Sequence, residues 1–286
     1  MRLFPSVFVH VMQRHRAGPL TGAVLWLAVR CWKLLRHLPV VNRVRIVLPV
    51  ADHRLRVRLF SYDDLLTASA NYEAGLALYW PSPGAVAIDA GAFIGRHTLS
   101  LARAVGPTGR VLAIEPHPAH WDMLSENVEL NSYKHVECIP CALGARTGQA
   151  KLRFDRESST ASLCGPGDNL AVVEVLQLDE LLSDRAIRTI DFLKVDVEGY
   201  EREVLTGARE ALTRSRATIV VERHDSPTMH ASLRCPIAAL LAEFGYNVTE
   251  HWEGPRAFYV ARPSSLSERS HARHSAPLAP VSRPNV

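Results

Sequence analysis

Short apolar runs alternate with segments of helical periodicity from residue 85 onward, and this alternation limits the fold more than any other feature. The runs are AVAID (85–89), VLAIE (111–115), DFLKVD (191–196) and ATIVVE (217–222). Apolar runs without interleaved polar residues are typical of strands buried on both faces, and intervening helices provide the crossovers between parallel strands. The pattern predicts an α/β fold with a doubly wound, mostly parallel sheet.

The remaining segments complete this prediction. We expect helices near 96–105, 117–131 and 200–212, a strand near 136–140, two short strands around a Ser/Gly-rich loop between 151 and 175, and a closing antiparallel hairpin from 244–248 and 257–261. Before the sheet, 44–50 and 55–60 predict a hairpin, and 62–80 predicts a helix. The expected organisation is a basic apolar N-terminal segment (1–42), an entry hairpin and helix (43–84), the main domain (85–262) and a disordered tail (263–286).

The charge is unevenly distributed along the 286 residues. Residues 1–50 hold eight Lys or Arg and no acid, whereas 51–261 hold 21 basic and 28 acidic residues. The net charge of +4 therefore arises from the two ends. An acidic central domain gives no reason to expect a nucleic-acid partner.

The N-terminal segment contains a short apolar run, GPLTGAVLWLAV (18–29), with basic residues on both sides. It is shorter than the ~18 to 20 apolar residues that a spanning helix needs. Three interpretations remain open: a helix packed on the domain or a partner, a helix lying on an anionic membrane surface, and a cleaved signal peptide.

A glycine-containing turn follows the first buried strand. Asp89, Gly91 and Gly95 form the pattern Asp-x-Gly-x-x-x-Gly at the point where strand gives way to helix. Phe93 occupies the place of the second glycine of the dinucleotide fingerprint, which disfavours a pyrophosphate ligand. Glu115 ends the next strand, where a carboxylate can accept the hydroxyls of a ribose. Together the turn and Glu115 indicate binding of S-adenosylmethionine.

Two more polar clusters follow buried strands. Asp196 and Glu198 come after DFLKV, while Glu222, His224 and Asp225 come at the end of ATIVVE. Carboxyl ends of parallel strands meet at one edge of a sheet, so these side chains are expected beside Asp89. Cys138 and Cys141 have redox-like spacing, but they follow a strand rather than open a helix, and we interpret them as packing residues.

The sequence resembles the FkbM-type family of S-adenosylmethionine-dependent methyltransferases over roughly residues 70–225. The stretches that carry the resemblance are IDAGAFIGRHTLSLA (88–102), VGPTGRVLAIEPHP (105–118), LSENVELN (124–131), ALGARTG (142–148), LQLDELL (176–182), DFLKVDVEGYEREVLTGA (191–208) and IVVE (219–222). The resemblance implies a Rossmann-like sheet of class I methyltransferase type. Phe93 departs from the Asn that the family often has at this position.

The resemblance also implies roles for individual residues. The expected cofactor-binding residues are Glu73, Asp89, Gly91, Ala92, Gly95, Glu115, Pro116, Ala142 and Leu143. The expected catalytic residues are Asp196, Glu198, Glu222 and His224, with Asp196 as the first candidate for general base or acceptor anchor and His224 as the second. An alternative is a Mg²⁺ ion held by Asp196, Glu222 and Asp225, since hard oxygen ligands suit that ion.

The expected function is O-methylation of a hydroxyl on a sugar, a glycolipid or a natural product. Two alternatives belong to other classes: a catalytically inactive binding protein with the same fold at a membrane surface, and an NAD-type oxidoreductase. The expected location is cytoplasmic, with peripheral contact to the inner face of the membrane through residues 1–40.

Overall fold

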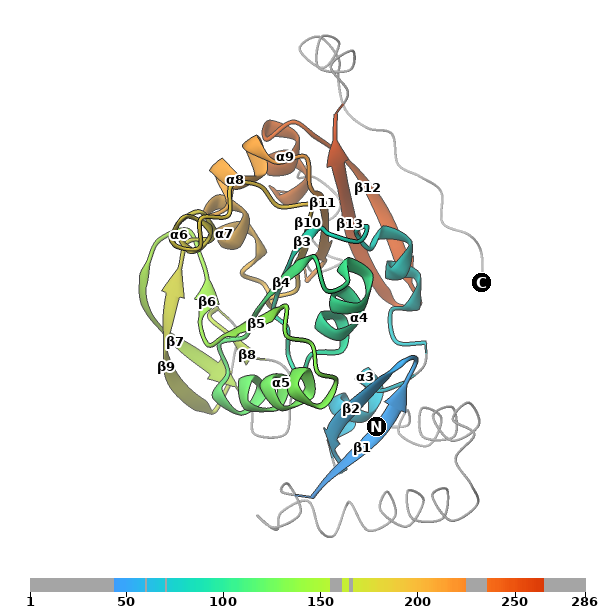
Figure 1. Cartoon of the computed structure of the whole chain (residues 1–286). Coiled ribbons are helices and arrows are strands. Elements are labelled where there is room, and N and C mark those ends of the chain that lie inside the picture. The colour runs from blue at the N-terminus through green and yellow to red at the C-terminus, as the bar shows by residue number, and fades with distance from the viewer. Residues whose placement is uncertain are drawn as a thin grey trace.

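The computed structural model describes residues 44–59, 61–69, 71–154, 161–164, 167–224 and 236–264. Its centre is a seven-stranded sheet in the order β12-β13-β11-β10-β3-β4-β5 (Figure 1). Five strands are parallel: β3 (Val86–Ala90), β4 (Arg110–Ile114), β5 (Val136–Ile139), β10 (Phe192–Val195) and β11 (Thr218–Glu222). The predicted doubly wound sheet is confirmed.

The sheet is closed at one edge by an antiparallel hairpin, as the sequence predicts. Strand β12 (Tyr246–Glu253) pairs with β13 (Arg256–Pro263), which in turn pairs antiparallel with β11. Both strands are longer than expected from the apolar residues alone. The register places Phe258, near the start of β13, beside Glu222 at the end of β11.

Helices cover both faces of the sheet. On one face lie α4 (Arg96–Val105) and α5 (Pro118–Leu130), and on the other lie α6 (Leu178–Asp184), α7 (Glu201–Thr206), α8 (Arg209–Arg214) and α9 (Pro236–Glu243) (Figure 1). Alternate residues of one strand enter opposite cores: Ile88 packs with α6 to α9, whereas Ala87 packs with α4. This two-sided burial explains why the strands are continuously apolar.

A second, four-stranded sheet has the order β6-β9-β7-β8. It contains β6 (Ala142–Leu143), β7 (Gly148–Phe154), β8 (Ala161–Ser162) and β9 (Asn169–Leu176). The long pair β7–β9 corresponds to the two strands predicted between residues 151 and 175. The entry hairpin consists of β1 (Arg45–Val50) and β2 (His53–Arg58) and packs on α5.

The single helix predicted over 62–80 is wrong. The segment forms the short helix α3 (Tyr62–Thr67) and a 3₁₀ helix, η2 (Ala74–Tyr79). Glu73, between them, has a left-handed backbone with φ of 48° that cannot continue an α-helix. Its carboxylate is buried against other elements, so a tertiary contact overrides the local periodicity.

The helix predicted over 200–212 also divides, into α7 and α8. Gly207 lies between them, and a Cβ there would overlap the carbonyl oxygen of Gly144. The Gly207 carbonyl accepts a hydrogen bond from the backbone of Asp179 instead of from the next helical turn. Close approach of two chain segments therefore interrupts a continuous helical pattern.

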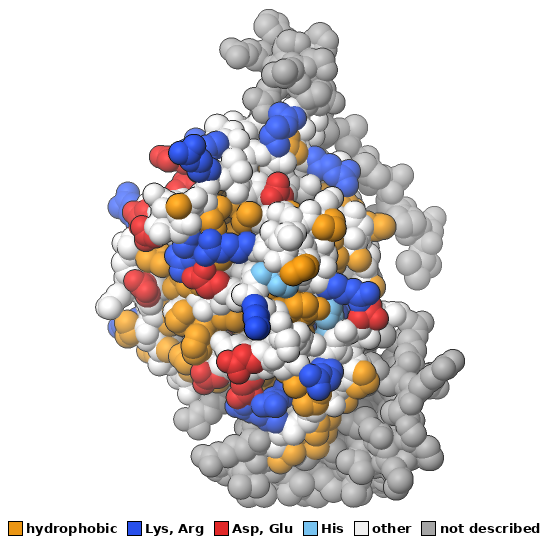
Figure 2. All heavy atoms as spheres, in the orientation of Figure 1, with side chains coloured by type: hydrophobic (Ala, Val, Ile, Leu, Met, Phe, Trp, Pro, Cys, Tyr) orange, Lys and Arg blue, Asp and Glu red, His pale blue; other side chains and the backbone are white. Residues whose placement is uncertain are grey.

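The predicted N-terminal helix within 1–42 and its membrane contact lie outside the described residues. Of the predicted disordered tail (263–286), Pro263 instead ends β13 and Ser264 is buried, and the rest lies outside the described residues. Among the helices in the described ranges, none has the length and apolar character needed to cross a bilayer. On the face shown in Figure 2, basic and acidic side chains are interspersed over the described surface.

Candidate functional site

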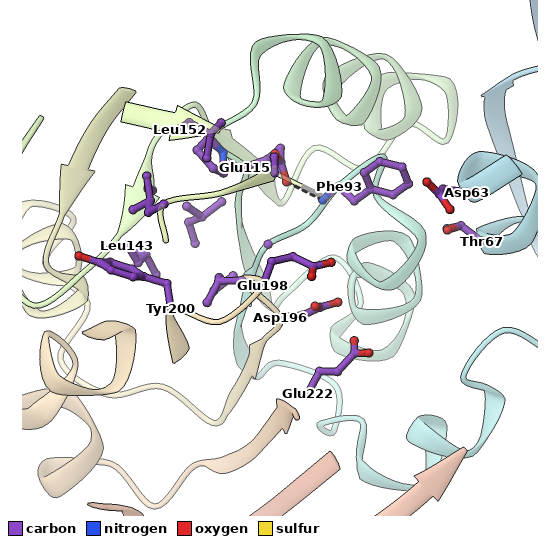
Figure 3. Close-up of a pocket in the computed structure, with 18 of the residues that line it drawn as sticks. Asp63, Thr67, Phe93, Glu115, Leu143, Leu152, Asp196, Glu198, Tyr200 and Glu222 are labelled. Carbon is purple, nitrogen blue, oxygen red and sulfur yellow. Dashed lines mark hydrogen bonds between the residues drawn. The ribbon is translucent and has the colours of Figure 1, made fainter. Parts of the chain in front are cut away.

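A pocket opens at the carboxyl ends of the parallel strands, where open α/β sheets bind ligands. The space between its lining residues is about 930 Å³, open solvent included. Figure 3 shows Asp196, Glu198 and Glu222 on one side of it, with Phe93 and Thr67 across from them. Its wall consists of Asp63, Leu66, Thr67, Tyr72, Ala90, Gly91, Phe93, Ile114, Glu115, Pro116, Ala142, Leu143, Leu152, Ala161, Leu163, Asp196, Val197, Glu198, Tyr200, Glu222 and Arg256.

The glycine turn after β3 forms the floor of the pocket. Gly91 has φ of 80°, and a Cβ at this position would overlap the carbonyl oxygen of Asp196. The backbone N–H groups of Gly91 and Ala92 both donate to the carbonyl of Ile114, at 3.0 Å each. Only glycine permits this close approach between the ends of β3 and β10.

Phe93 also has a left-handed backbone, with φ of 51°. Asn is several-fold enriched in this conformation, and a bulky residue there is uncommon. The departure from the family's Asn therefore falls at a backbone position that Asn suits. The Phe93 ring meets the His120 ring edge-on, with centroids 4.6 Å apart.

Glu115 follows β4 and is 5 % exposed. One carboxylate oxygen accepts the Phe93 N–H at 2.8 Å (Figure 3), and the other accepts the His117 N–H at 2.9 Å. These two bonds fix the carboxylate and leave acceptor capacity on both oxygens. The arrangement suits two adjacent hydroxyls of a ribose.

Four of the predicted cofactor residues do not line the pocket: Glu73, Asp89, Ala92 and Gly95. Asp89 is fully buried and accepts a hydrogen bond from the Thr98 hydroxyl at 2.6 Å. Its other oxygen lies 3.9 Å from the Lys194 ammonium. Asp89 is therefore placed to support the glycine turn from within the core and does not contact the pocket.

Glu73 is likewise buried, at 5 % exposure. It bonds to His97 Nε2 at 2.7 Å and to the guanidinium of Arg256. The neighbouring Tyr72 and Arg256 reach the pocket in its place. Glu73 thus joins the entry segment, α4 and β13 behind the pocket wall.

The second sheet provides an apolar wall near Glu115. Ala142 and Leu143, predicted from the resemblance, line it together with Leu152 and Leu163. Such a surface suits a flat aromatic base such as adenine.

Asp196 lies at the opposite side of the pocket, after β10. It accepts a hydrogen bond at 3.0 Å from Lys194, whose side chain is 2 % exposed. Burial opposes ionisation of Asp196, but the Lys194 ammonium and the His224 imidazolium hold the pKa of its carboxyl well below its usual value. Asp196 is therefore a fixed negative charge and a weak proton acceptor.

The pKa of Glu222 is shifted in the direction opposite to that of Asp196. Burial, reinforced by the negative charge of Asp196, raises the pKa of the Glu222 carboxyl. Burial also raises the pKa of Glu198. The pocket thus combines an ionised carboxylate with carboxyls that hold their protons to higher pH, an arrangement found at acid–base sites.

His224 does not line the pocket but contacts residues that do. Its Nε2 lies 3.4 Å from Glu198 and 3.8 Å from Asp196, and its Nδ1 is 2.8 Å from Glu201. Burial disfavours protonation, but the hydrogen bond to Glu201 and the surrounding carboxylates outweigh it and raise the pKa of His224 to about 9.

Of the three predicted metal ligands, Asp225 lies outside the described residues. Within the described ranges, the group whose ligand atoms come within 4.8 Å of one another is Asp196, Glu198 and His224.

Cys138 and Cys141 are both free thiols in packed surroundings. Burial raises the pKa of the Cys138 thiol to about 11 and that of Cys141 to about 12, which is the behaviour of inert packing cysteines.

Sequence reasoning missed several residues of the site. Lys194, which does not line the pocket but holds Asp196, carried a usable signal, because it is a lone lysine within a buried apolar strand. Arg256, Tyr72 and Asp63 carried none: they come from the closing hairpin and the entry segment, and only tertiary structure brings them to the strand ends.

Comparisons with known proteins place the chain in a family. A model of the methyltransferase FkbM domain matches residues 89–248. The chain is 30% identical over 195 residues to methyltransferase sdnD of Sordaria araneosa, covering 57% of this chain and 73% of that protein. It is 26% identical over 200 residues to the 31-O-demethyl-FK506 methyltransferase FkbM of Streptomyces tacrolimicus, covering 58% of this chain and 74% of that protein.

A third relative is the hexuronic acid methyltransferase AglP of Haloferax volcanii, 29% identical over 140 residues, with 48% of this chain and 54% of that protein covered. A solved structure of a methyltransferase FkbM from Methylobacillus flagellatus aligns at a TM-score of 0.46 and 19% identity, covering 91% of this chain and 59% of that one. The chain thus spans between about half and three quarters of the length of these curated relatives. Because the domain model matches more than half of its length, this chain belongs to the FkbM family of S-adenosylmethionine-dependent methyltransferases.

Proposed function

We propose that this protein transfers the methyl group of S-adenosylmethionine to a hydroxyl oxygen of a sugar, a glycolipid or a natural product. The observation that carries the proposal is one pocket in which Gly91 and Glu115 lie at one side and Asp196, Glu198 and Glu222 at the other. The names of two relatives, a hexuronic acid methyltransferase and a 31-O-demethyl-FK506 methyltransferase, support an acceptor of this kind.

The residues present fit the cofactor. Gly91 lines the pocket at the turn after β3, Glu115 has acceptor capacity for ribose hydroxyls, and Leu143 adds an apolar surface for adenine. When bound, the cofactor supplies a methyl group activated as a sulfonium. The protein then has two tasks, to align the acceptor oxygen with that methyl group and to take up the hydroxyl proton.

Alignment contributes more to catalysis than proton removal does, since holding the reactants in position lowers the activation barrier by about 7 to 11 kcal/mol. We assign the anchoring of the acceptor to Asp196, because its carboxylate is held by Lys194 and stays ionised. Its hydrogen bond to an acceptor hydroxyl orients the oxygen without removing the proton.

For proton removal, Glu222 and His224 are better matched than Asp196. General-base catalysis contributes ~10²- to 10⁴-fold and is most efficient when the base has a pKa near the working pH. Glu222 and His224 have raised pKa values, and Glu222 lines the pocket directly. We therefore assign removal of the hydroxyl proton to Glu222 as the first candidate and to His224 as the second.

Asp196→Asn tests this division of roles. The amide keeps the size of the side chain but loses the charge that orients the acceptor, so transfer should fall by about 10²-fold while S-adenosylmethionine still binds. Asp122→Asn, an exposed position on α5, is the matched control and should leave both unchanged. Full activity of Asp196→Asn on an acceptor that the parent protein methylates would remove Asp196 from the mechanism.

A divalent cation remains an alternative at this edge of the sheet, with ligands from the set Asp196, Glu222 and Asp225 or from Asp196, Glu198 and His224. Measuring the activity of the purified protein before and after dialysis against a chelator separates a mechanism that needs a divalent cation from one that relies on a general base alone. Loss of activity that Mg²⁺ or Mn²⁺ restores would support the mechanism with a cation.

We also propose that the basic N-terminal segment brings the protein to an anionic membrane surface, which would favour a lipid-linked acceptor. The eight basic residues without an acid in 1–50 support this proposal. The full chain should co-sediment with phosphatidylserine vesicles at low salt and be released at high salt. Equal binding to neutral vesicles, or none to either, would contradict it.

A further inference from the structure

The charged side chains of the pocket are unevenly divided by sign. Five acidic residues line it within the described part of the chain, and Arg256 is the only Lys or Arg among the lining residues there. S-adenosylmethionine carries a carboxylate and an ammonium at its methionine end. The acidic residues suit the ammonium and the sulfonium, but they would repel the carboxylate.

Arg256 is held in place by its neighbours. Its guanidinium lies over the Tyr72 ring, 4.7 Å from the centroid, and one nitrogen donates to the buried Glu73. Glu73 is bonded in turn to His97 at 2.7 Å, on the helix that follows the glycine turn. This chain of contacts ties the cation on β13 to the helix that begins at the cofactor turn.

These contacts leave capacity for another anion. A guanidinium has five N–H donors in a planar fork, and its contact with Glu73 does not use all of them. The Arg256 side chain is 32 % exposed and lines the pocket. Its Nε lies 3.9 Å from Glu222, which is beyond hydrogen-bond distance.

We propose that Arg256 binds the carboxylate of the methionine moiety of S-adenosylmethionine. This inference rests on the proposed function and assigns a cofactor role to a residue outside the sequence motifs. Tyr72 and Glu73 then act as positioning residues, because they orient the guanidinium without touching the ligand carboxylate. A charged hydrogen bond of this kind corresponds to about 10- to 100-fold in affinity.

Two ligands that differ at the methionine end provide the test. S-adenosylhomocysteine carries the carboxylate, whereas 5′-methylthioadenosine keeps the nucleoside and lacks the whole amino-acid portion. Calorimetric titration of the full chain gives Kd for each ligand, and the ratio of the two Kd values isolates the amino-acid contribution. Arg256→Gln should raise the Kd for S-adenosylhomocysteine by about 10- to 100-fold, while the Kd for 5′-methylthioadenosine should change by less than about twofold.

Arg262→Gln is the matched control. Arg262 is exposed on the same strand and also stacks on a tyrosine, Tyr79, but it does not line the pocket. Its substitution should leave both Kd values unchanged. Because Arg256→Gln leaves Glu73 buried without its cation, the paired variant Arg256→Gln with Glu73→Gln is measured as well, and it should show the same selective loss.

Equal weakening of both ligands in the paired variant, or no weakening of either, would overturn the assignment. So would unchanged Kd values together with a raised KM for an acceptor that carries a carboxylate, since Arg256 would then serve the acceptor. If the unsubstituted protein binds neither ligand, the proposed function fails first.

Discussion

At the scale of single residues, a charge network around Lys194 connects Asp89, which precedes the glycine turn, with Asp196 at the end of β10. The Lys194 side chain, only 2 % exposed, lies 3.0 Å from Asp196 and 3.9 Å from Asp89. The two carboxylates, together with Glu73 and Glu222, raise the pKa of Lys194 despite the opposing effect of burial. Lys194 therefore stays charged and compensates both acids.

Removing this lysine should destabilise the fold strongly. Lys194→Met leaves the buried Asp89 without its cation and Asp196, whose side chain is 19 % exposed, with His224 alone. Removing one partner of a buried ion pair costs about 3 to 5 kcal/mol of unfolding free energy. Denaturant titration measures the loss, and Lys151→Met at an exposed position of β7 should stay within ~0.5 kcal/mol of the parent. A loss for Lys194→Met no larger than that of the control would show that the network contributes nothing to stability.

The pH dependence of catalysis follows from Glu222 and His224. A general base must be deprotonated to accept a proton, and the raised pKa values of both groups keep them protonated at lower pH. We therefore expect kcat/KM to rise with pH between about pH 6 and about pH 9, as more of the base form is present. Glu222→Gln should flatten this rise if Glu222 is the base, whereas a profile that falls with pH would exclude both residues.

Residues in strand-end motifs could be predicted from the sequence, and residues held by tertiary contacts could not. Gly91, Glu115, Asp196 and Glu222 all line one pocket, because each follows a strand whose direction the alternating pattern determines. Arg256 reaches the same pocket from a hairpin without a motif. Asp89, although part of the motif, is buried beneath the turn rather than exposed in it.

At the scale of elements, the sheet was predictable and the helices that carry tertiary contacts were not. The strands begin and end within a few residues of the apolar runs, because burial on both faces requires uninterrupted apolar sequence. The segments 62–80 and 200–212 each have helical periodicity, yet Glu73 and Gly207 interrupt them for contacts with distant residues. Periodicity records which face is buried, and it does not record such contacts.

The glycine turn gives a prediction at this scale. Gly91→Ala places a Cβ against the carbonyl of Asp196 in a left-handed conformation, so the turn must move and S-adenosylmethionine binding should be lost. Gly106→Ala is the control, since Gly106 also has positive φ, at 66°, but nothing lies within 4 Å of its added Cβ. It should cost only the strain of a backbone conformation that favours glycine, about 1 to 3 kcal/mol, with binding retained. Equal affinity in both variants would contradict the close-approach argument.

At the scale of the whole molecule, the pocket draws on parts of the chain that are far apart in sequence. The entry segment contributes Tyr72, the central sheet contributes Glu115 and Asp196, the second sheet contributes Leu152, and the closing hairpin contributes Arg256. A ligand that binds this pocket should therefore stabilise the described domain as a unit, by RT ln(1 + [L]/Kd).

The most direct test of the account is calorimetric titration of the full-length chain with S-adenosylmethionine, beside Glu115→Ala and Glu129→Ala, an exposed control on α5. We predict micromolar binding to the parent and to Glu129→Ala, and loss of binding in Glu115→Ala, because we assign the ribose hydroxyls to the carboxylate of Glu115. Equal binding by all three proteins would contradict the assignment of the ribose hydroxyls to Glu115. Absence of binding at millimolar ligand would contradict the assignment of this pocket to the cofactor and would favour a binding protein with an inactive methyltransferase fold.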